Sequence, residues 1–334
     1  MSQPSSLCPN PMQVHSLQQE TADVWTLNLI NNDFYPYQPG QFALVSIRDS
    51  EDTLRAYTLS SSPGLSPFIS ISVRCLADGL GSRWLTQEVK PGQTLWLSDA
   101  QGEFSCVQHP SDSYLMLAAG CGVTPIMSMC RWLVVNKPQC DIRVIFNVRT
   151  PADVIFAEQW QRLCAAHPQL QLTLMAEQDA QPGFLSGRIN EQVLQQAAPD
   201  IASRTVMTCG PAPYMQQVEQ LCLGLGVPTA NFHQEQFHTS AQLDDGKSEQ
   251  LTLRIGQPLR EFHVPVGSTL LAALEAHKLP VNAACRAGVC GSCKTRIIDG
   301  QYTTTSTMTL TPAEIEQGYV LACSCQLQGD VTLA

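Results

Sequence analysis

Three cysteines stand close together near the carboxyl end of the chain, in the stretch CRAGVCGSCKTR. Cys285, Cys290 and Cys293 follow the spacing C-x4-C-x2-C, and Cys323 comes after a separate apolar run, YVLA. Small residues fill the intervals of the loop, so its backbone can curve tightly and aim N–H groups at sulfur atoms. Such a loop requires a fold that brings a distant thiol to the other three, which restricts this part of the chain more than any other feature does.

The cysteine spacing is the plant-type pattern for a [2Fe–2S] cluster, which takes its ligands from one loop and one distant cysteine. Zinc ribbons instead pair two C-x2-C knuckles, whereas the tail of this chain offers C-x-C. A disulfide pattern would place adjacent pairs in a reducing compartment. We therefore predict a cluster rather than zinc or structural thiols, with Cys285, Cys290, Cys293 and Cys323 as ligands. Cys325 is the alternative fourth ligand, and we expect it to be a bystander.

Length and composition exclude several functional classes. A chain of 334 residues is long enough for two or three domains. Its formal net charge of −10 argues against nucleic acid as a partner. No signal peptide is recognisable at the N-terminus, and Gly120, Gly122 and Pro125 interrupt the longest apolar stretch, so we expect no membrane partner. Single cysteines inside apolar runs are typical of reduced thiols, so the expected location is the cytoplasm.

The hydrophobic pattern changes along the chain and predicts three domains. Residues 8–108 contain short alternating runs such as VWTLNL and FISISV between Pro-Gly turns, which is typical of an antiparallel β-barrel. Residues 109–237 alternate strands (YLMLAA, IRVIFNV, TVMTC) with helices, which predicts a parallel α/β domain. Residues 238–250 are polar and resemble a linker. Residues 251–334, with two short strands, a helix and the cysteine loop, predict a small α+β domain.

A candidate flavin site lies in the barrel, at RAYTLSSSPG. A flavin needs a cation for its phosphate, an aromatic ring over its ring system and a hydroxyl near N5. Arg55, Tyr57 and Thr58 supply these groups on one strand. The glycines of Gly79–Ser82 then open a helical stretch, where free N–H groups suit a pyrophosphate. A plain strand with a surface arginine would explain the first motif alone, but the order of both motifs before a nucleotide domain favours flavin.

A candidate nicotinamide site follows at AAGCGVTPI, which is a strand, a glycine turn and a helix. It departs from the fingerprint G-x-G-x-x-G because Pro125 replaces the third glycine. Proline suits the first helical position, so the anion-binding helix start is kept. Cys209 and Gly210 end a later strand, where ligands of parallel sheets collect. This position favours a Cys209 thiol beside the nicotinamide over one that is merely buried.

The choice between NADH and NADPH is read after the second strand of the α/β domain. Arg149 and Asp153 lie there, without the dense cluster of Arg and Lys that a 2′-phosphate needs. Asp153 could accept a hydrogen bond from a free ribose hydroxyl. The sequence therefore predicts NADH.

The ordered set RAYTLSS, GLGS, GCGVTP, CGP and CRAGVCGSC resembles the ferredoxin–NADP⁺ reductase superfamily of flavoproteins fused to a plant-type ferredoxin. The resemblance covers nearly the whole chain. It implies a flavin-binding barrel that holds FAD, with FMN as the alternative, an NADH-binding α/β domain and a β-grasp ferredoxin domain. The flavin contacts implied by the match are Arg55, Tyr57, Thr58, Val73, Arg74, Gly81, Ser82, Glu235 and Phe237. The nicotinamide contacts implied by the match are Gly120, Gly122, Thr124, Pro125, Cys209 and Gly210, with Cys209 and Thr58 closest to the chemistry.

Within that superfamily the chain is similar to reductases that pass electrons from NADH through FAD and a [2Fe–2S] cluster to hybrid cluster protein. That resemblance implies a role in nitric oxide removal under nitrosative stress. A flavin is needed between the two because NADH gives a hydride and the cluster accepts one electron. The alternative is the reductase component of a ring-hydroxylating or demethylating oxygenase. A redox sensor is disfavoured, since a sensing cluster needs no hydride donor.

Three cations surround the cluster loop, namely Arg286, Lys294 and Arg296. The ordinary explanation is a solvated surface. A second hypothesis is a basic collar that docks an acidic patch of the electron acceptor.

Overall fold

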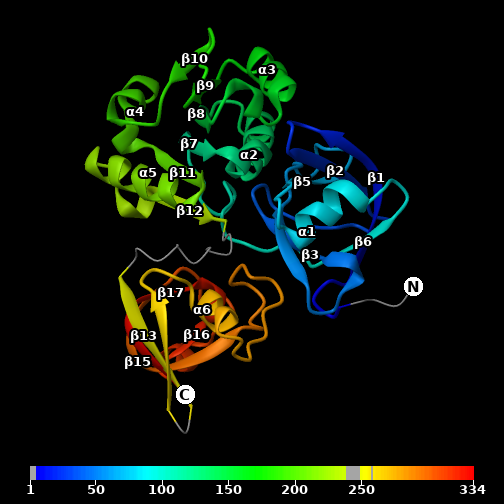
Figure 1. The fold of residues 1–334 in the computed structure, drawn as a ribbon. Coiled ribbons are helices and arrows are strands. Elements are labelled where there is room, and N and C mark those ends of the chain that lie inside the picture. The colour runs from blue at the N-terminus through cyan, green and yellow to red at the C-terminus, as the bar shows by residue number, and fades with distance from the viewer. Residues whose placement is uncertain (1–4, 238–248, 257–258) are drawn as a thin grey trace. The chain divides into compact units, whose positions relative to one another are not determined.

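We describe a computed structural model of the chain that covers residues 5–237, 249–256 and 259–334 (Figure 1). The chain divides into two compact units, of which the first contains residues 8–49 and 57–237. The second contains the C-terminal residues from 249 onward, together with residues 5–7 and 50–56. Most of the predicted linker 238–250 lies outside the described residues, and Gln250 already belongs to a strand.

An antiparallel barrel forms the first part of the first unit, as predicted. Leu27, Leu29 and Ile71 alternate with polar residues and fill its interior, which is the period expected of half-buried strands. A bridge between Leu59 and Ile71 joins the two strands at the ends of the sheet and closes it. The sheet order is β4-β3-β6-β1-β2-β5, with β1 (Asn10–Gln19), β2 (Val24–Ile30), β3 (Phe42–Ser46), β4 (Leu54–Thr58), β5 (Ile69–Arg74) and β6 (Thr94–Leu97).

The α/β domain follows in the same unit, and its six strands are all parallel to their neighbours. Three of these strands match the predicted ones, and the structure adds β9, β10 and β12. The sheet order is β10-β9-β8-β7-β11-β12, with β7 (Ser113–Ala119), β8 (Asp141–Val148), β9 (Leu170–Ala176), β10 (Phe184–Ser186), β11 (Thr205–Gly210) and β12 (Phe232–Gln236).

Helices cover both faces of the parallel sheet (Figure 1). Tyr114 and Met116 of β7 pack with α2 (Val123–Asn136) and α3 (Ala157–Ala166). Leu115 of the same strand points to the opposite face, where the core includes residues of α4 (Glu191–Ala197) and α5 (Ala212–Gly224). A strand buried on both faces is typical of doubly wound sheets. No helix in the described part of the chain is long and apolar enough to cross a membrane.

Buried serines connect the barrel to α2 within the first unit. Ser128 of α2 donates from Oγ to the carbonyl oxygen of Ser61, and its own carbonyl oxygen accepts a 2.7 Å bond from Ser62 Oγ. Arg131, one turn later, donates to the carbonyl oxygen of Ser60 at 2.9 Å. These serines belong to the predicted flavin motif RAYTLSSSPG, shortly after Thr58. The nucleotide domain is therefore anchored to the segment that leaves the flavin strand.

The second unit contains a five-stranded mixed sheet with a short helix, which confirms the α+β prediction. Leu270 and Leu274 of the helix pack in the same core as Cys323 and Cys325. The order is β14-β13-β17-β15-β16, with β13 (Gln250–Ile255), β14 (Arg260–Pro265), β15 (Lys294–Thr304), β16 (Tyr319–Leu321), β17 (Cys325–Leu333), α6 (Leu270–Ala276) and α7 (Pro312–Glu316).

Arg204 is a buried cation that stabilises the start of β11. Its side chain is 3% exposed and pairs with Asp141 at 2.5 Å and Asp200 at 2.7 Å. It also donates to the carbonyl oxygen of Tyr114 at 3.2 Å. Three hydrogen bonds to one buried guanidinium are expensive to lose, because the remaining acceptors keep no equivalent partner.

We expect Arg204→Met to lower the free energy of unfolding of the first unit by about 2 kcal/mol, measured by urea denaturation. Arg204 lowers the pKa of Asp200 by hydrogen bonding, so this stabilisation is present above the unfolded pKa and is lost as pH falls. The difference in the free energy of unfolding between the Arg204→Met variant and the wild type should therefore become smaller below about pH 4. Arg162→Met is the control, because the exposed pair Arg162–Glu158 should contribute under about 0.5 kcal/mol.

Candidate functional site

The flavin motif lies on β4, and one of its polar atoms has no partner. Thr58 is buried at the end of the strand, and its Oγ1 makes no hydrogen bond to any described residue. Arg55 and Tyr57 are half-buried on the same strand. A buried hydroxyl without a partner is costly unless a ligand supplies one. An orphaned hydroxyl on the strand that also carries an aromatic ring and a guanidinium fits a flavin.

The predicted helical stretch after the glycines is present. It consists of α1 (Leu80–Arg83) and a π-helical turn, Trp84–Glu88. Ser82 Oγ accepts from the Leu76 N–H at 3.1 Å and donates to the Gly79 carbonyl oxygen at 3.3 Å. A Cβ at Gly79 would stand 2.2 Å from that hydroxyl. Gly79 and Ser82 thus shape the turn itself, and the backbone N–H groups are what it offers a ligand.

Val73 and Arg74, at the end of β5, face different surroundings. The Val73 side chain is buried in the barrel core, so it can reach a cofactor only through its backbone. The Arg74 guanidinium lies against Gly120, with Nη1 3.4 Å from the position of a Cβ there. It also forms an ion pair with Asp23 at 3.2 Å. Arg74 therefore stands beside the glycine turn of the α/β domain.

The glycine turn contacts the end of β11 by backbone alone. Gly120 has φ +52°, in the region that favours glycine. A Cβ at Gly122 would lie 2.0 Å from the Cys209 carbonyl oxygen and 2.7 Å from the Gly210 nitrogen. Any side chain at Gly122 would force the two segments apart. Thr124 closes the turn by donating from Oγ1 to the Cys121 carbonyl oxygen at 2.9 Å.

Pro125 is not the first residue of its helix, contrary to the prediction. A 3-10 turn over Gly120–Gly122 leads into α2, which starts at Val123 and makes Pro125 its third residue. The first four N–H groups of a helix have no partner within it. Proline at the third position consequently costs no helical hydrogen bond.

Cys209 and Glu235 are neighbours in the register of β11 and β12. Burial raises the pKa of the Cys209 thiol well above its usual range, and Glu235 adds to the effect. Burial also raises the pKa of Glu235 to about 8, and its Oε2 has no partner among the described residues. Phe237 packs against the core of the α/β domain. A protonated thiol and an unpaired carboxyl thus stand at the edge where a ligand of the parallel sheet would lie.

A cavity of about 330 Å³ brings together several of the predicted nucleotide residues, namely Arg74, Gly120, Arg149 and Asp153. Four other residues that the sequence analysis missed line the same cavity: Asn147, Glu177, Arg188 and Tyr214. A usable signal existed for Glu177, because it directly follows β9 at the carboxyl edge of the sheet.

Each guanidinium of the cavity is matched by a carboxylate. Arg149 pairs with Asp153 at 3.4 Å, and Arg188 pairs with Glu177 at 3.3 Å. Asp153 also accepts from the Thr150 backbone N–H and hydroxyl, at 3.0 Å and 2.9 Å. The predicted ribose acceptor is therefore already engaged in a local turn. The paired charges leave little attraction for a further phosphate.

The four predicted cluster ligands converge in the second unit. Cys293 and Cys323 have their sulfur atoms 3.3 Å apart, and the Cys285 thiol contacts both Cys290 and Cys323. The Gly288 N–H donates to Cys323 Sγ at 3.1 Å. Within the described residues, no group of three or more His, Cys, Asp or Glu side chains is yet arranged to hold a metal ion. The donor set, four thiols with N–H groups aimed at sulfur, fits a [2Fe–2S] cluster.

The geometry of the cysteine loop depends on two glycines and on the segment that contains Ser306. Gly288 and Gly291 have φ +72° and +77°. A Cβ at Gly288 would stand 2.8 Å from Ser306 Cβ, and Ser306 Oγ donates to the Gly288 carbonyl oxygen at 2.6 Å. Cys323 and Cys325 are both buried in the core of the unit. It is the Cys323 sulfur, however, that contacts Cys293 and the Gly288 N–H. Cys323 is thus the cysteine of the C-x-C pair that the fold delivers to the loop.

Two of the three cations around the loop are engaged in ion pairs, whereas Arg296 donates from Nε to the Gln317 carbonyl oxygen at 3.0 Å. Arg286 makes a two-pronged ion pair with Glu275. Lys294 pairs with Glu314 at 2.5 Å. Paired charges attract an acidic partner less than free ones.

Family models match all three domains of the chain. "Oxidoreductase FAD-binding domain" matches residues 13–106. "Oxidoreductase NAD-binding domain" matches residues 116–220. "2Fe-2S iron-sulfur cluster binding domain" matches residues 254–328. The matches identify the cofactors of the barrel, the parallel sheet and the cysteine loop as FAD, NADH and a [2Fe–2S] cluster.

Curated relatives and solved structures agree with this order of domains. The chain is 57% identical over the full length of both proteins to "NADH oxidoreductase HCR" of Escherichia coli. It is 29% identical to the "Glycine betaine monooxygenase reductase subunit" of Chromohalobacter salexigens, over 91% of this chain and 89% of that one. Phthalate dioxygenase reductase has the same fold, with a TM-score of 0.63, 20% identity and 97% of each chain covered. The chain therefore belongs to the family of NADH oxidoreductases that transfer electrons through FAD and a [2Fe–2S] cluster.

Proposed function

We propose that this enzyme is the NADH-dependent reductase of hybrid cluster protein and that it serves nitric oxide removal in the cytoplasm under nitrosative stress. The observation that carries the proposal is the 57% identity to NADH oxidoreductase HCR over the whole of both chains. The oxygenase reductases among its relatives share only 29% or less. They keep the same domain order, so an oxygenase is the second candidate for the electron acceptor.

We assign the flavin to the barrel and the nicotinamide to the carboxyl edge of the parallel sheet. Thr58 would supply its unpaired hydroxyl to the flavin ring, with Tyr57 and Arg55 on the same strand. Cys209 and Glu235 would stand beside the nicotinamide, which would give the unpaired Glu235 Oε2 a partner. When bound, the flavin divides the electron pair of the hydride into single electrons for the cluster.

The chain's own contribution at this site is positioning and the exclusion of charge. Gly122 keeps the helix start of α2 in contact with Cys209, so a dinucleotide can meet free N–H groups there. Burial raises the pKa of both Cys209 and Glu235, which favours an uncharged thiol and an uncharged carboxyl at this edge. We further propose domain boundaries at 8–108, 109–237 and 251–334.

Electron transfer to hybrid cluster protein is the direct test of the proposed partner. In an anaerobic stopped-flow instrument, the NADH-reduced enzyme should reduce purified hybrid cluster protein rapidly and with saturation. Cys323→Ala should abolish this transfer while NADH still reduces the flavin, because the mutation removes a proposed cluster ligand. Faster reduction of glycine betaine monooxygenase than of hybrid cluster protein would reject the proposed partner.

The identity of the fourth cluster ligand can be tested with a matched pair of variants. Cys325→Ala should keep the EPR signal of the reduced cluster and its iron content, because Cys325 lies in the apolar core. Cys323→Ala should lose most of both, because its sulfur lies 3.3 Å from that of Cys293. The assignment fails if the two variants exchange these outcomes.

The charge pairs of the 330 Å³ cavity should decide the preference for NADH. Glu177→Gln combined with Asp153→Asn would free Arg188 and Arg149 to attract a 2′-phosphate. We expect kcat/KM for NADPH to rise about tenfold, which corresponds to about 1.4 kcal/mol, while that for NADH falls. Glu158→Gln is the control, since its ion pair with Arg162 lies outside this cavity. An unchanged ratio of the two coenzymes in the double variant would show that the pairs play no part.

A further inference from the structure

A second cavity, of about 440 Å³, opens between the barrel and α2–α3. Ser60 is the one residue of the flavin motif RAYTLSSSPG that lines it, and none of the flavin or nicotinamide contacts implied by the family resemblance does. Its walls carry two arginines and a histidine, Arg131, Arg162 and His167, and no aspartate or glutamate. The whole chain has 29 acidic and 19 basic residues. A cavity whose charged groups are all cationic is unexpected on such an acidic protein, and it selects for anions.

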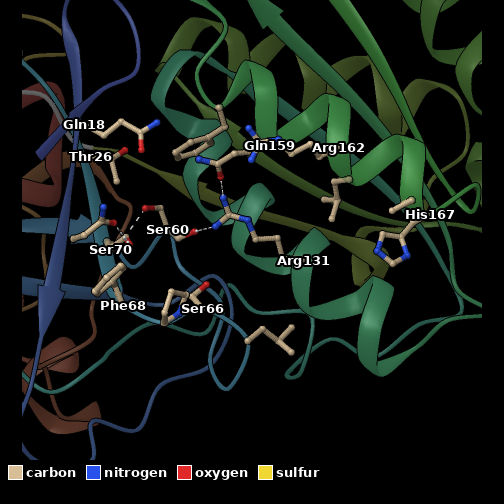
Figure 2. Close-up of a pocket in the computed structure, with 16 residues that line it drawn as sticks. Gln18, Thr26, Ser60, Ser66, Phe68, Ser70, Arg131, Gln159, Arg162 and His167 are labelled. Atoms are coloured by element: carbon tan, nitrogen blue, oxygen red, sulfur yellow. Dashed lines mark hydrogen bonds between the residues drawn. The ribbon is translucent and has the colours of Figure 1, made fainter. Parts of the chain in front are cut away.

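Arg131 is the central charge of this cavity (Figure 2). Its guanidinium donates to two neutral acceptors, the Ser60 carbonyl oxygen at 2.9 Å and the Gln159 side chain. No carboxylate of the described residues forms an ion pair with it. Burial lowers the pKa of Arg131, which shows that its charge is poorly solvated. A desolvated cation with neutral partners gains from an anion that enters the cavity.

Glu20 is the acidic residue that acts on Arg131 from outside the cavity lining. Burial raises the pKa of Glu20, and its Oε1 has no hydrogen-bond partner among the described residues. Its other contacts are to Thr26 and to the Phe156 backbone. Glu20 therefore balances the guanidinium only in part.

Arg162 can form an ion pair with a ligand anion with little loss of free energy from its present pair with Glu158. Its pair with Glu158 is 2.7 Å long, but the two side chains are 77% and 79% exposed. Exposed pairs of this kind contribute under about 1 kcal/mol and exchange readily with solvent. A ligand anion can therefore replace Glu158 as the partner of Arg162.

The remaining walls of the cavity suit a ligand that has a flat ring and polar edges. Phe68 forms one wall and stacks on His15 with ring centroids 4.5 Å apart, which holds its ring in place. Phe156 forms another wall below the Arg131 guanidinium and has φ +63°, a strained conformation for a residue with a side chain. Such strain is often kept where a ligand is clamped. Ser66 and Ser70 line the barrel side (Figure 2).

We propose that this cavity binds a small organic dianion, a phosphomonoester with a flat ring, whose phosphate is held by Arg131 and Arg162. Two guanidinium groups match a dianion better than a monocarboxylate, and guanidinium geometry suits phosphate oxygens. Arg131 already holds the Ser60 carbonyl oxygen, two residues after Thr58. Ligand binding is therefore coupled to the segment that follows the flavin strand.

Phenyl phosphate is the probe for this site, titrated by calorimetry into the FAD- and cluster-loaded enzyme with NAD⁺ present to fill the nucleotide site. We expect saturable binding with a Kd of about 0.1–1 mM. Arg131→Gln and Arg162→Gln should each weaken it at least about tenfold, and Arg162→Gln alters only an exposed side chain. Arg48→Gln is the control, because Arg48 pairs with Glu88 on the barrel surface away from the cavity.

Two results would overturn the proposal. One is the absence of saturable binding by the wild-type enzyme. The other is wild-type affinity for phenyl phosphate in both Arg162→Gln and Arg131→Gln, with the Arg131 variant shown to be folded. Inorganic phosphate is the second probe. If it binds with the same affinity as phenyl phosphate, the flat ring contributes nothing to binding and that part of the proposal is rejected. A change in the flavin circular dichroism on binding, absent in Arg162→Gln, is expected from the bond between Arg131 and Ser60.

Discussion

The contact between Gly122 and Cys209 is the constraint on which the rest of the first unit depends. A Cβ at Gly122 would stand 2.0 Å from the Cys209 carbonyl oxygen, so only glycine lets α2 begin at the end of β11. From that point α2 runs to the barrel, where Ser128 and Arg131 hold the serines that follow the flavin strand. One helix thereby relates the nucleotide edge of the sheet to the flavin strand. A displacement of the backbone at Gly122 would therefore move both the nucleotide edge of the sheet and the segment after the flavin strand.

Two unsatisfied buried groups lie where we propose that the cofactors bind. Thr58 Oγ1 and Glu235 Oε2 are buried without partners, although buried polar groups in proteins are almost always hydrogen-bonded. In the second unit the loop thiols crowd together and receive backbone N–H groups, while Cys325 lies among apolar side chains. The free energy lost at these groups in the absence of ligands is regained on binding. Arg131 points to the anion cavity on other grounds, because its hydrogen bonds go to neutral acceptors and no carboxylate of the described residues forms an ion pair with it.

The sequence predicted the three architectures because each rests on a local period of apolar residues, and it proposed four cysteine ligands that the fold brings together. It missed β9, β10 and β12: β10 is three residues long, and β12 is a polar edge strand. It also missed Glu177, whose role depends on Arg188, eleven residues away and joined only by the fold. It also missed the partners of Arg286 and Lys294, since Glu275 and Glu314 reach the loop from separate helices. Side-chain partners that are distant in sequence are what local patterns do not encode.

The central claim is that one chain carries electrons from NADH through the flavin of the barrel to the cluster of the second unit. An anaerobic titration with NADH, followed by flavin absorbance and by EPR of the reduced cluster, tests it most directly. The account predicts that NADH bleaches the flavin and that the cluster signal then grows in the same sample. Bleached flavin with a cluster that stays oxidised, yet is reducible by dithionite, would contradict it.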